Sequence, residues 1–380
     1  MLSLEALLWT ITALSTLMLL YPYLIYPLIL SILPHVKVET RSSTPSTGGS
    51  FALLFCAYNE AKALPAKIGN LRALTTAYPE LEVLVYDDCS SDGTADLLEA
   101  ACPNIQVVRG THRAGKAHGM KLLAALTKRE FLVFTDANVE LDIEVLTRLQ
   151  ECYADSAVGG VCGLLEYLNP DGTPTAEVGN WYWRLEEAIK TSESRTGNVM
   201  GADGSIFSIR RAYYPKFDDS VLDDLTVSMS VIFQGKRLIK EPTVIAREHL
   251  VASNTEDFRR RIRIATRAFH THMTLRPQLR GMPLGDRWRY WSHRYLRWHG
   301  AIFILTGGAA GATALALTTS WFTAVVAVAT IAAVMLTATK IRLGPVSAVV
   351  HLVWSVLLTG IGVLRARRGG TMTIWVPPAR

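Results

Sequence analysis

The sequence predicts an α/β fold with a mostly parallel sheet, flanked at both ends of the chain by membrane-spanning helices. Short apolar runs alternate with helical patterns from residue 50 onward, and long stretches near the two chain ends are almost free of charge. Alternating strands and helices are typical of a parallel sheet with helices on both faces. Stretches of about 20 apolar residues are long enough to cross the hydrocarbon of a bilayer.

The apolar stretches define the outer segments. Each carries at most one charged or histidine side chain: Leu4 to Leu33, Ala301 to Thr339, and Val346 to Leu364. The first is longer than the roughly 7–15 apolar residues of a signal peptide, and no basic segment precedes it, so we expect an anchor rather than a cleaved signal. We predict one membrane helix within residues 1–35 and about three within residues 300–364, the longest block being divided by a turn.

The composition of the remaining segments predicts their organisation. Residues 36–49 are rich in Ser, Thr, Pro and Gly, as expected of a linker. Residues 50–280 are expected to form the α/β domain, residues 281–299 an amphipathic helix at the membrane surface, and residues 365–380 a basic tail. The five cysteines show no metal-binding spacing and are typical of small core residues in a reducing compartment.

Positive charge is concentrated in one segment. The stretch from Arg259 to Arg297 holds eleven Arg, no Lys and one Asp, which predicts an anionic partner such as phosphate or lipid headgroups. RWRYWSHRYLRW, residues 287–298, interleaves basic and aromatic side chains. This pattern also occurs in nucleic-acid-binding segments. Because an apolar stretch follows at once, we expect an interfacial helix that contacts membrane lipids, and no nucleic-acid partner.

The expected strands end in polar residues. Strands are expected at Ser50–Ala57, Leu81–Tyr86, Ile105–Val108 and Phe131–Phe134, with helices at Lys62–Ala77, Gly93–Ala101 and Gly115–Leu126. The polar groups that follow these strands are Tyr58-Asn59-Glu60, Asp87-Asp88, Arg109 to Lys116, and Asp136. Ligands of such sheets bind at the carboxyl ends of the strands, so we expect one cleft.

Two kinds of chemistry meet in this cleft. Acidic residues at neighbouring strand ends repel one another unless a cation or a hydrogen-bonding ligand lies between them, which makes Asp88 and Asp136 a functional pair. Asp92, within DCSSDGT, is expected mainly to stabilise the turn and to cap the following helix. Arg113 and Lys116 flank a glycine just before a helix, where backbone N–H groups and the helix dipole favour phosphate.

Six ordered motifs carry a family resemblance. They are CAYNEAKALPAKIGNLRAL, VYDDCSSDGTADLL, RAGKAHGM, FTDANVELD, GADGSIFSIRR and LDDLTVSMSVIFQGKRL. Together they resemble a family 2 glycosyltransferase over roughly Ser50 to His270. Within that family the chain looks like the membrane-bound, cellulose-synthase-like branch that also holds hyaluronan, chitin and poly-N-acetylglucosamine synthases. The resemblance implies a GT-A fold and inversion at the anomeric carbon of a nucleotide-activated sugar.

The resemblance assigns the donor site. It implies that Asp88 bonds the uracil of a UDP-sugar and that the strand end Ala57-Tyr58-Asn59-Glu60 lies beside the base. It places Arg113 and Lys116 near the diphosphate. Asp136 would lie at the ribose and the metal, Mg²⁺ or Mn²⁺, and Asn138 occupies the position of the family's second metal-binding aspartate.

The resemblance also assigns the reaction side. Asp224, in VLDDLTVSM, matches the family's general base, which takes the acceptor hydroxyl's proton opposite the leaving diphosphate. Helix capping is the competing role for Asp223 and Asp224, and we expect it of Asp223. The loop Asp203-Gly204-Ser205 would contact the acceptor sugar.

The segment FRRRIRIATR, residues 258–267, stands in the place of the QxxRW motif of processive synthases. Arg260 and Arg263 would correspond to its Gln and Arg, near the donor diphosphate, and Arg267 shares their helix face. Ile264 replaces the tryptophan that stacks on the acceptor sugar, which disfavours long processive synthesis. An arginine face that binds anionic lipid is the alternative. His270 and His272 lack further ligands at metal spacing, so we expect no metal there.

These features lead to three hypotheses. The first is an inner-membrane, multi-pass transferase with a cytoplasmic catalytic domain that extends a polysaccharide or oligosaccharide, with export subunits as possible partners. The second is a transfer of one sugar to a polyprenyl phosphate or a lipid-linked oligosaccharide. The third is an inactive scaffold or nucleotide-sugar sensor. One conflict remains, because three C-terminal spans would place Arg365 to Arg368 outside, against the positive-inside tendency.

Overall fold

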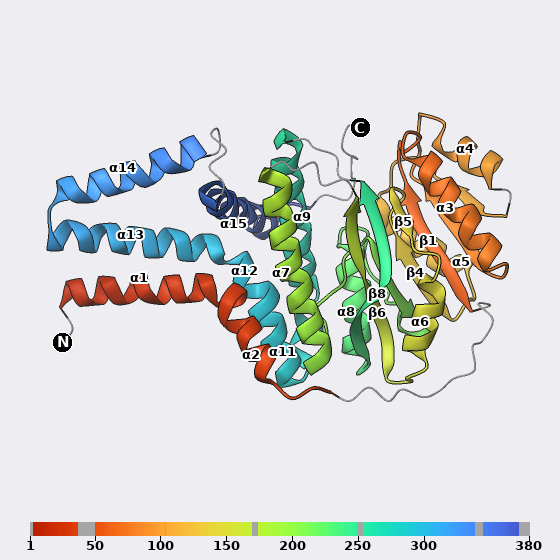
Figure 1. Cartoon of the computed structure of the whole chain (residues 1–380), viewed down its shortest axis with the longest axis horizontal. Coiled ribbons are helices and arrows are strands. Elements are labelled where there is room, and N and C mark those ends of the chain that lie inside the picture. Colours follow the sequence, from red (N-terminus) through yellow and green to blue (C-terminus); the bar gives the residue numbers. More distant parts are fainter. Residues whose placement is uncertain are drawn as a thin grey trace.

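The computed structural model describes residues 3–36, 50–102, 104–168, 174–249, 254–338 and 345–371. The expected linker at 36–49 lies almost wholly outside these residues, as does most of the expected tail at 365–380. A domain built on one sheet lies at one end of the molecule and a bundle of apolar helices at the other (Figure 1). The long helices α7 Pro174–Thr196, α9 Asn254–Thr274 and α15 Pro345–Arg367 lie between the sheet and the bundle.

One mixed sheet of eight strands forms the domain, in the order β3-β2-β1-β4-β7-β6-β8-β5. Its strands are β1 Phe51–Ala57, β2 Glu82–Asp87, β3 Gln106–Arg109, β4 Phe131–Thr135, β5 Val139–Leu141, β6 Val158–Leu168, β7 Ile206–Arg210 and β8 Arg237–His249. The first four pair in parallel, whereas β7 is antiparallel to both β4 and β6. The expected α/β fold with a mostly parallel sheet is confirmed, and β5 to β8 extend the sheet beyond the four strands expected.

Helices cover both faces of the sheet. They are α3 Leu64–Ala77, α4 Thr94–Ala101, α5 Lys116–Leu126, α6 Val145–Tyr153 and α8 Asp223–Phe233. Alternate residues of β1 enter two separate cores, Leu54 with Met120 of α5 and Phe55 with Leu71 of α3. At Gly119 a Cβ atom would lie 2.3 Å from the Tyr86 ring, so only glycine lets α5 approach β2 this closely. This approach brings the first residue of α5, Lys116, to the strand ends.

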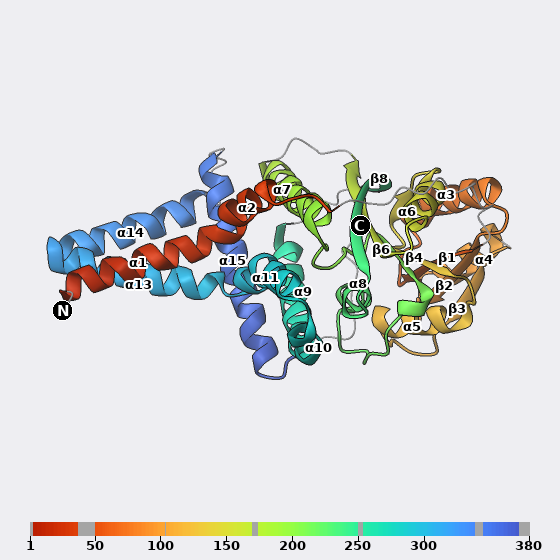
Figure 2. The same ribbon diagram turned by 90° about the horizontal axis from the view of Figure 1, so that it is seen from below.

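The apolar bundle consists of α1 Leu4–Leu20, α13 Gly300–Thr318 and α14 Trp321–Ala338, which lie side by side (Figures 1 and 2). Small residues bring α1 and α13 together: the Thr12 hydroxyl donates to the Gly307 carbonyl at 3.3 Å, and Ser15 lies beside Gly307. Such close contacts between small residues are common between membrane helices. Within the described residues, three stretches are long and apolar enough to cross a membrane: Leu4–Ile32, Gly300–Thr318 and Val349–Arg367.

The last helix, α15 Pro345–Arg367, runs crosswise to the bundle (Figure 2). It packs mainly along α9, and it meets α13 at the domain end of that helix. Gly360 approaches Ala301, and the Arg367 guanidinium bonds to His299 at 2.9 Å. Beyond the helix, Thr371 donates to the Ser220 carbonyl of the domain at 3.3 Å. The C-terminal end of α15 therefore returns to the domain side of the bundle.

Four helical segments join the bundle to the domain. They are α7 Pro174–Thr196, α9 Asn254–Thr274, α10 Arg276–Gly281 and the continuous run of α11 Leu284–Tyr290, η3 Trp291–Tyr295 and α12 Leu296–Trp298. The last run covers the residues expected as a surface helix. The N-terminal helix α1 continues as η1 Tyr21–Ile25 and α2 Tyr26–Ile32. The α11–α12 run packs against α7 and this continuation, and its His293 and Arg289 are buried there. Much of its basic face therefore bonds to protein.

Candidate active site

The carboxyl ends of β1, β2 and β4 lie next to one another in the sheet and carry the polar residues expected there. After β1, Ala57 is buried and Asn59 adopts a positive φ of 50°. The side-chain amide oxygen of Asn59 accepts from the Ser91 backbone N–H at 2.9 Å, and the buried Glu60 uses its backbone N–H to bond Thr94. This segment is thus pinned to the turn after β2. Asp92 helps to hold it, because its carboxylate accepts from the Ala61 amide and from Thr94.

Asp88 organises the loop before α5. It is fully buried, and its carboxylate accepts from the backbone N–H of Ala114 at 2.7 Å, from that of Gly115 at 3.0 Å and from the Arg113 guanidinium at 3.0 Å. Arg113 in turn stacks on the Tyr58 ring with its guanidinium carbon 3.2 Å from the ring centre. Asp88 therefore shapes the loop, whereas Tyr58 and Arg113 form the wall that a bound base would meet.

Three charged side chains from different elements surround Gly204. A Cβ atom on Gly204 would lie 3.1 Å from Lys116 Nζ, 3.2 Å from Asp224 Oδ2 and 3.9 Å from Asp136 Oδ2. Lys116 also donates to Asp136 at 2.5 Å. The absence of a side chain at Gly204 leaves the space between the three groups open. The structure thus brings together four of the residues expected to bind donor, acceptor or proton.

The two acids at the start of α8 set the electrostatics of this centre. Burial, followed by repulsion from the buried Asp223, raises the pKa of Asp224 to about 7. Burial alone would lower the pKa of Lys116, but Asp136, Asp223 and Asp224 raise it above its ordinary value. Near pH 7 the Asp224 carboxyl therefore exchanges its proton readily beside a fixed positive charge, as a catalytic base must.

The expected metal position offers few protein ligands. Asp136 contributes carboxylate oxygens, and the Asn138 amide nitrogen donates to Glu248 of β8 at 2.6 Å, which leaves the Asn138 carbonyl oxygen as its possible ligand. Within the described residues, no group of three or more His, Cys, Asp or Glu side chains is placed to hold a metal ion. These oxygens fit Mg²⁺ or Mn²⁺ chemistry only if substrate phosphates complete the coordination.

Comparison with known proteins agrees with this geometry. Residues 53–217 match the family described as Glycosyl transferase family 2. This part of the chain is a family 2 glycosyltransferase domain.

Two relatives of this domain share a type of acceptor in their names, whereas a third, of Staphylococcus haemolyticus, is named a 4,4'-diaponeurosporenoate glycosyltransferase. Polyprenol monophosphomannose synthase of Mycolicibacterium smegmatis is 29% identical over 219 residues, covering 52% of this chain and 77% of the relative. Undecaprenyl-phosphate mannosyltransferase of Micrococcus luteus is 44% identical over 61 residues, covering 15% of this chain and 24% of the relative. The comparisons thus support the family but not the cellulose-synthase-like branch expected from the motifs.

A solved structure resembles the glycosyltransferase domain together with the helices. It is the mannosyltransferase PcManGT from Pyrobaculum calidifontis in complex with GDP-Man and Mn²⁺, with a TM-score of 0.72 and 21% identity. The match covers 94% of this chain and 99% of that one. The expected GT-A fold is therefore confirmed, including its association with apolar helices.

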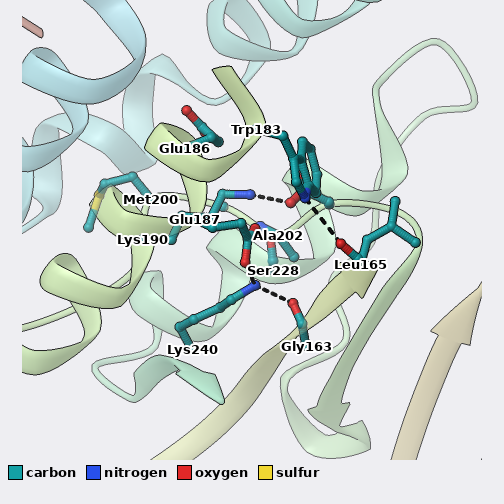
Figure 3. A network of polar contacts seen from close by, with 12 residues as sticks. Gly163, Leu165, Trp183, Glu186, Glu187, Lys190, Met200, Ala202, Ser228 and Lys240 are labelled. Carbon is teal, nitrogen blue, oxygen red and sulfur yellow. Dashed lines mark hydrogen bonds and ion pairs between the residues drawn. The ribbon is translucent and has the colours of Figure 1, made fainter. Parts of the chain in front are cut away.

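The loop Asp203-Gly204-Ser205 is held by residues that the motifs did not indicate. Lys190 of α7 is buried and forms an ion pair with Asp203, while the neighbouring Lys240 of β8 pairs with Glu187 and donates to the Gly163 carbonyl (Figure 3). Burial alone would raise the pKa of Asp203, but Lys190 lowers it below its ordinary value. Of the expected acceptor residues, Ser205 has its carbonyl bonded by Thr135 at 2.9 Å.

The same helix connects this loop to the membrane end. Glu193 of α7 accepts from the Tyr26 hydroxyl at 2.6 Å and from the Met200 amide at 3.1 Å, and it bonds His293 at 2.8 Å. Arg294 donates to the carbonyl oxygens of Met200 and Gly201. One signal could have indicated this role, because Glu186, Lys190 and Glu193 recur at helical spacing and therefore share one face of α7.

The arginines of α9 lie along the membrane side of the pocket. Arg267 donates to the Val221 carbonyl at 3.0 Å, three residues before Asp224. Burial and the charges of Glu248 and Asp203 raise the pKa of Tyr167 of β6, whereas the charge of Arg260 lowers it. The two histidines have other contacts: His270 bonds Ser220, and His272 bonds the Tyr290 hydroxyl at 3.1 Å.

Proposed function

We propose that this glycosyltransferase transfers a single hexose, with mannose the first candidate, from a nucleoside diphosphate sugar to a polyprenyl phosphate at the membrane surface. The observation that carries the proposal is the match to a polyprenol monophosphomannose synthase over 77% of that relative's length. The arrangement agrees with it, because α9 contacts the turn before Asp224 on one side and packs against the apolar helix α15 on the other. This reading replaces the polysaccharide synthase as the leading hypothesis.

The donor binds at the strand ends in this proposal. Tyr58 and Arg113 would contact the base, and the unpartnered buried oxygen Asp87 Oδ1 lies at the same strand end. Lys116 and the N-terminal turn of α5 would hold the diphosphate. The nucleobase is left open between uracil and guanine, since the UDP expectation came from the synthase branch.

The reaction is an inverting displacement at the sugar's C1. A phosphate oxygen of the acceptor forms a bond to C1 while the bond from C1 to the nucleoside diphosphate breaks, and the electron pair leaves with the diphosphate. Lys116 stabilises the charge on that leaving group. Asp224 takes the last proton of the acceptor phosphate when that phosphate enters as a monoanion. Because the second pKa of a phosphate monoester is about 6, most acceptors need no base above pH 7.

A divalent cation fits this scheme with Asp136 and Asn138 as its protein ligands. When bound, it would supply further positive charge to the departing diphosphate. Lys116 already neutralises one carboxylate oxygen of Asp136, so the protein on its own provides little negative charge for the cation. We therefore expect the nucleotide to supply the missing coordination.

Product analysis tests the proposal. Purified protein in detergent is given labelled GDP-mannose, UDP-glucose or UDP-N-acetylglucosamine, each with and without polyprenyl phosphate. We expect one sugar on the lipid phosphate, released by mild acid and absent without lipid. A long polymer formed from the donor alone would refute single transfer and restore the synthase hypothesis.

The Asp224→Asn variant tests the nucleophile. With a phosphate acceptor at pH 8 we expect about a tenfold or smaller loss of kcat. Removal of a general base from a hydroxyl acceptor costs about 10²- to 10⁴-fold. A loss in that larger range at pH 8 would show that the acceptor is a hydroxyl group.

A further inference from the structure

Helix α9 has two faces with different surroundings. On one face, Ile262, Ala265 and Thr266 pack against α15, where a Cβ on Gly362 would lie 2.6 Å from Ala265 Cβ and 2.9 Å from the Ile262 carbonyl. On the other face, Arg267 reaches the turn before Asp224, and Arg260 lies near Tyr167. The helix thus separates an apolar helix from a cationic wall of the pocket.

The cationic wall consists of Arg260, Arg263 and Arg267, spaced three and four residues apart. Arg267 is 7% exposed, and its Nε is buried without a hydrogen-bond partner among the described residues. Burial, followed by the charges of Arg260 and Arg267, lowers the pKa of Arg263. Neighbouring guanidinium groups repel one another, and a bound anion would offset that repulsion. Arginine binds phosphate through paired N–H groups.

An apolar side chain interrupts this wall. Ile264 follows Arg260 by four residues and precedes Arg267 by three, so it shares their face of the helix. It is 45% exposed, whereas its neighbours Ala265 and Thr266 are buried. An exposed branched aliphatic side chain between arginines suits a ligand in which hydrocarbon follows directly on a phosphate.

We propose that Arg260, Arg263, Arg267 and Ile264 form the subsite for the acceptor's headgroup: the guanidinium groups bind the phosphate, and Ile264 contacts the first isoprene units. This inference rests on the proposed function and deepens it. It reassigns Arg260 and Arg263, which the family resemblance placed at the donor diphosphate. It also explains why no tryptophan is needed at position 264, since no acceptor sugar has to stack there.

Reaction geometry favours the acceptor over the donor at this wall. Inversion requires the nucleophile and the leaving group on opposite sides of C1. Lys116 and Arg113 already provide cations at the strand ends, whereas Arg267 of α9 contacts the turn before Asp224. A second cationic group beside α15 and the bundle therefore suits the phosphate that arrives with the lipid.

Kinetics of three variants test the subsite. Arg263→Gln removes one guanidinium from the wall, Ile264→Ser removes the apolar contact, and Arg261→Gln is the matched control. Arg261 lies on the same helix with the same charge, but it is exposed and donates to Ser355 of α15 at 2.9 Å. The acceptors are undecaprenyl phosphate in detergent micelles and water-soluble phenyl phosphate, and donor hydrolysis without acceptor is measured in parallel.

We expect Arg263→Gln to raise KM for both phosphate acceptors about 10- to 100-fold, the loss typical of a charged hydrogen bond, with the donor KM unchanged. Ile264→Ser should raise KM about fivefold for the lipid and leave it unchanged for phenyl phosphate. Arg261→Gln should match the wild type. A rise in donor KM alone in Arg263→Gln would overturn the subsite and restore its donor role. Lack of transfer to any phosphate by the wild type would instead refute the proposed function.

Discussion

At the scale of single residues, the candidate reaction centre is formed by the side chains of Lys116, Asp136 and Asp224, which lie close together around Gly204. The opening at Gly204 exists because no side chain fills it. Two adjacent acids, Asp223 and Asp224, begin α8, and their repulsion contributes to the raised pKa of Asp224. Two acids held this close together destabilise the folded state, and such perturbed groups are common at functional sites.

The first prediction concerns that cost. The pKa of Asp224, about 7, lies above the ordinary value of 3.8, so folding favours the protonated carboxyl. Stability should therefore fall as the pH rises from about 4 to about 7 and then stay level. Asp224→Asn should raise the free energy of unfolding on the order of 2 kcal/mol at pH 8 and have little effect at pH 4. Thermal unfolding in detergent at both pH values measures this, and an equal Tm gain at both would contradict it.

A second prediction concerns Asn138, whose amide donates to Glu248. Asn138→Asp would set a carboxylate against Glu248 and raise the local negative charge. We expect a lower Tm without metal and a larger Tm increase on adding Mn²⁺ than the wild type shows without nucleotide. Titration of Tm against Mn²⁺, with and without nucleoside diphosphate, separates the two proteins. Tight Mn²⁺ binding by the nucleotide-free wild type would oppose the idea that phosphates complete its coordination.

At the scale of elements, α7 connects the N-terminal helix α2 to the loop Asp203-Gly204-Ser205. Glu193 of α7 bonds Tyr26 of α2, and Lys190, one turn earlier, pairs with Asp203. Charges removed from water in this way are costly unless each keeps its partner, so the partners define the position of the helix. The loop at residues 199–205 is consequently held from the membrane side.

The third prediction uses the two buried lysines of Figure 3 as a matched pair. Lys190→Met and Lys240→Met each leave one acid without its partner, and breaking a buried pair costs about 3–5 kcal/mol. Both variants should lose Tm. Only Lys190→Met should also lower kcat tenfold or more with the donor Kd unchanged, because Asp203 precedes Gly204. Equal kcat values for the two variants at a temperature where both are folded would show that Lys190 is merely structural.

At the scale of the whole molecule, the crosswise course of α15 bears on the expected topology. Helices α1, α13 and α14 lie side by side, whereas α15 meets the domain end of α13 and contacts α9. If α1, α13 and α14 cross the bilayer and α15 does not, Arg365 to Arg368 lie on the same side as the domain. We expect this arrangement because it agrees with the positive-inside tendency.

The fourth prediction tests this topology. We expect Ser320→Cys, in the turn between α13 and α14, to react with a membrane-impermeant maleimide on intact cells. Arg368→Cys should react only after the membrane is opened. Both are made in a background in which the exposed Cys89 is replaced by serine. Reaction of Arg368→Cys on intact cells would show that α15 crosses the membrane.

Much of the domain was predictable because its signals are local. Apolar runs ended by Asp88 and Asp136 predicted β2 and β4 and the edge of the sheet where polar groups gather. For the stretch from Val346 to Leu364, the local signals predict an apolar helix but not the helices beside it. Its composition suits a membrane span. Composition alone does not show that Gly362 packs against Ala265 and that the helix therefore lies against α9.

The sequence by itself determined the fold class, the family and the identity of the charged residues, because periodicity and motif order are properties of neighbouring residues. Tertiary structure alone decided which charges meet. Lys190 reaches Asp203 across a helix and a loop, and the Asn138 amide reaches Glu248 across 110 positions. A buried charge is stable only beside a partner. Which residue becomes that partner depends on the distance between the two side chains in the fold, and spacing along the chain does not give that distance.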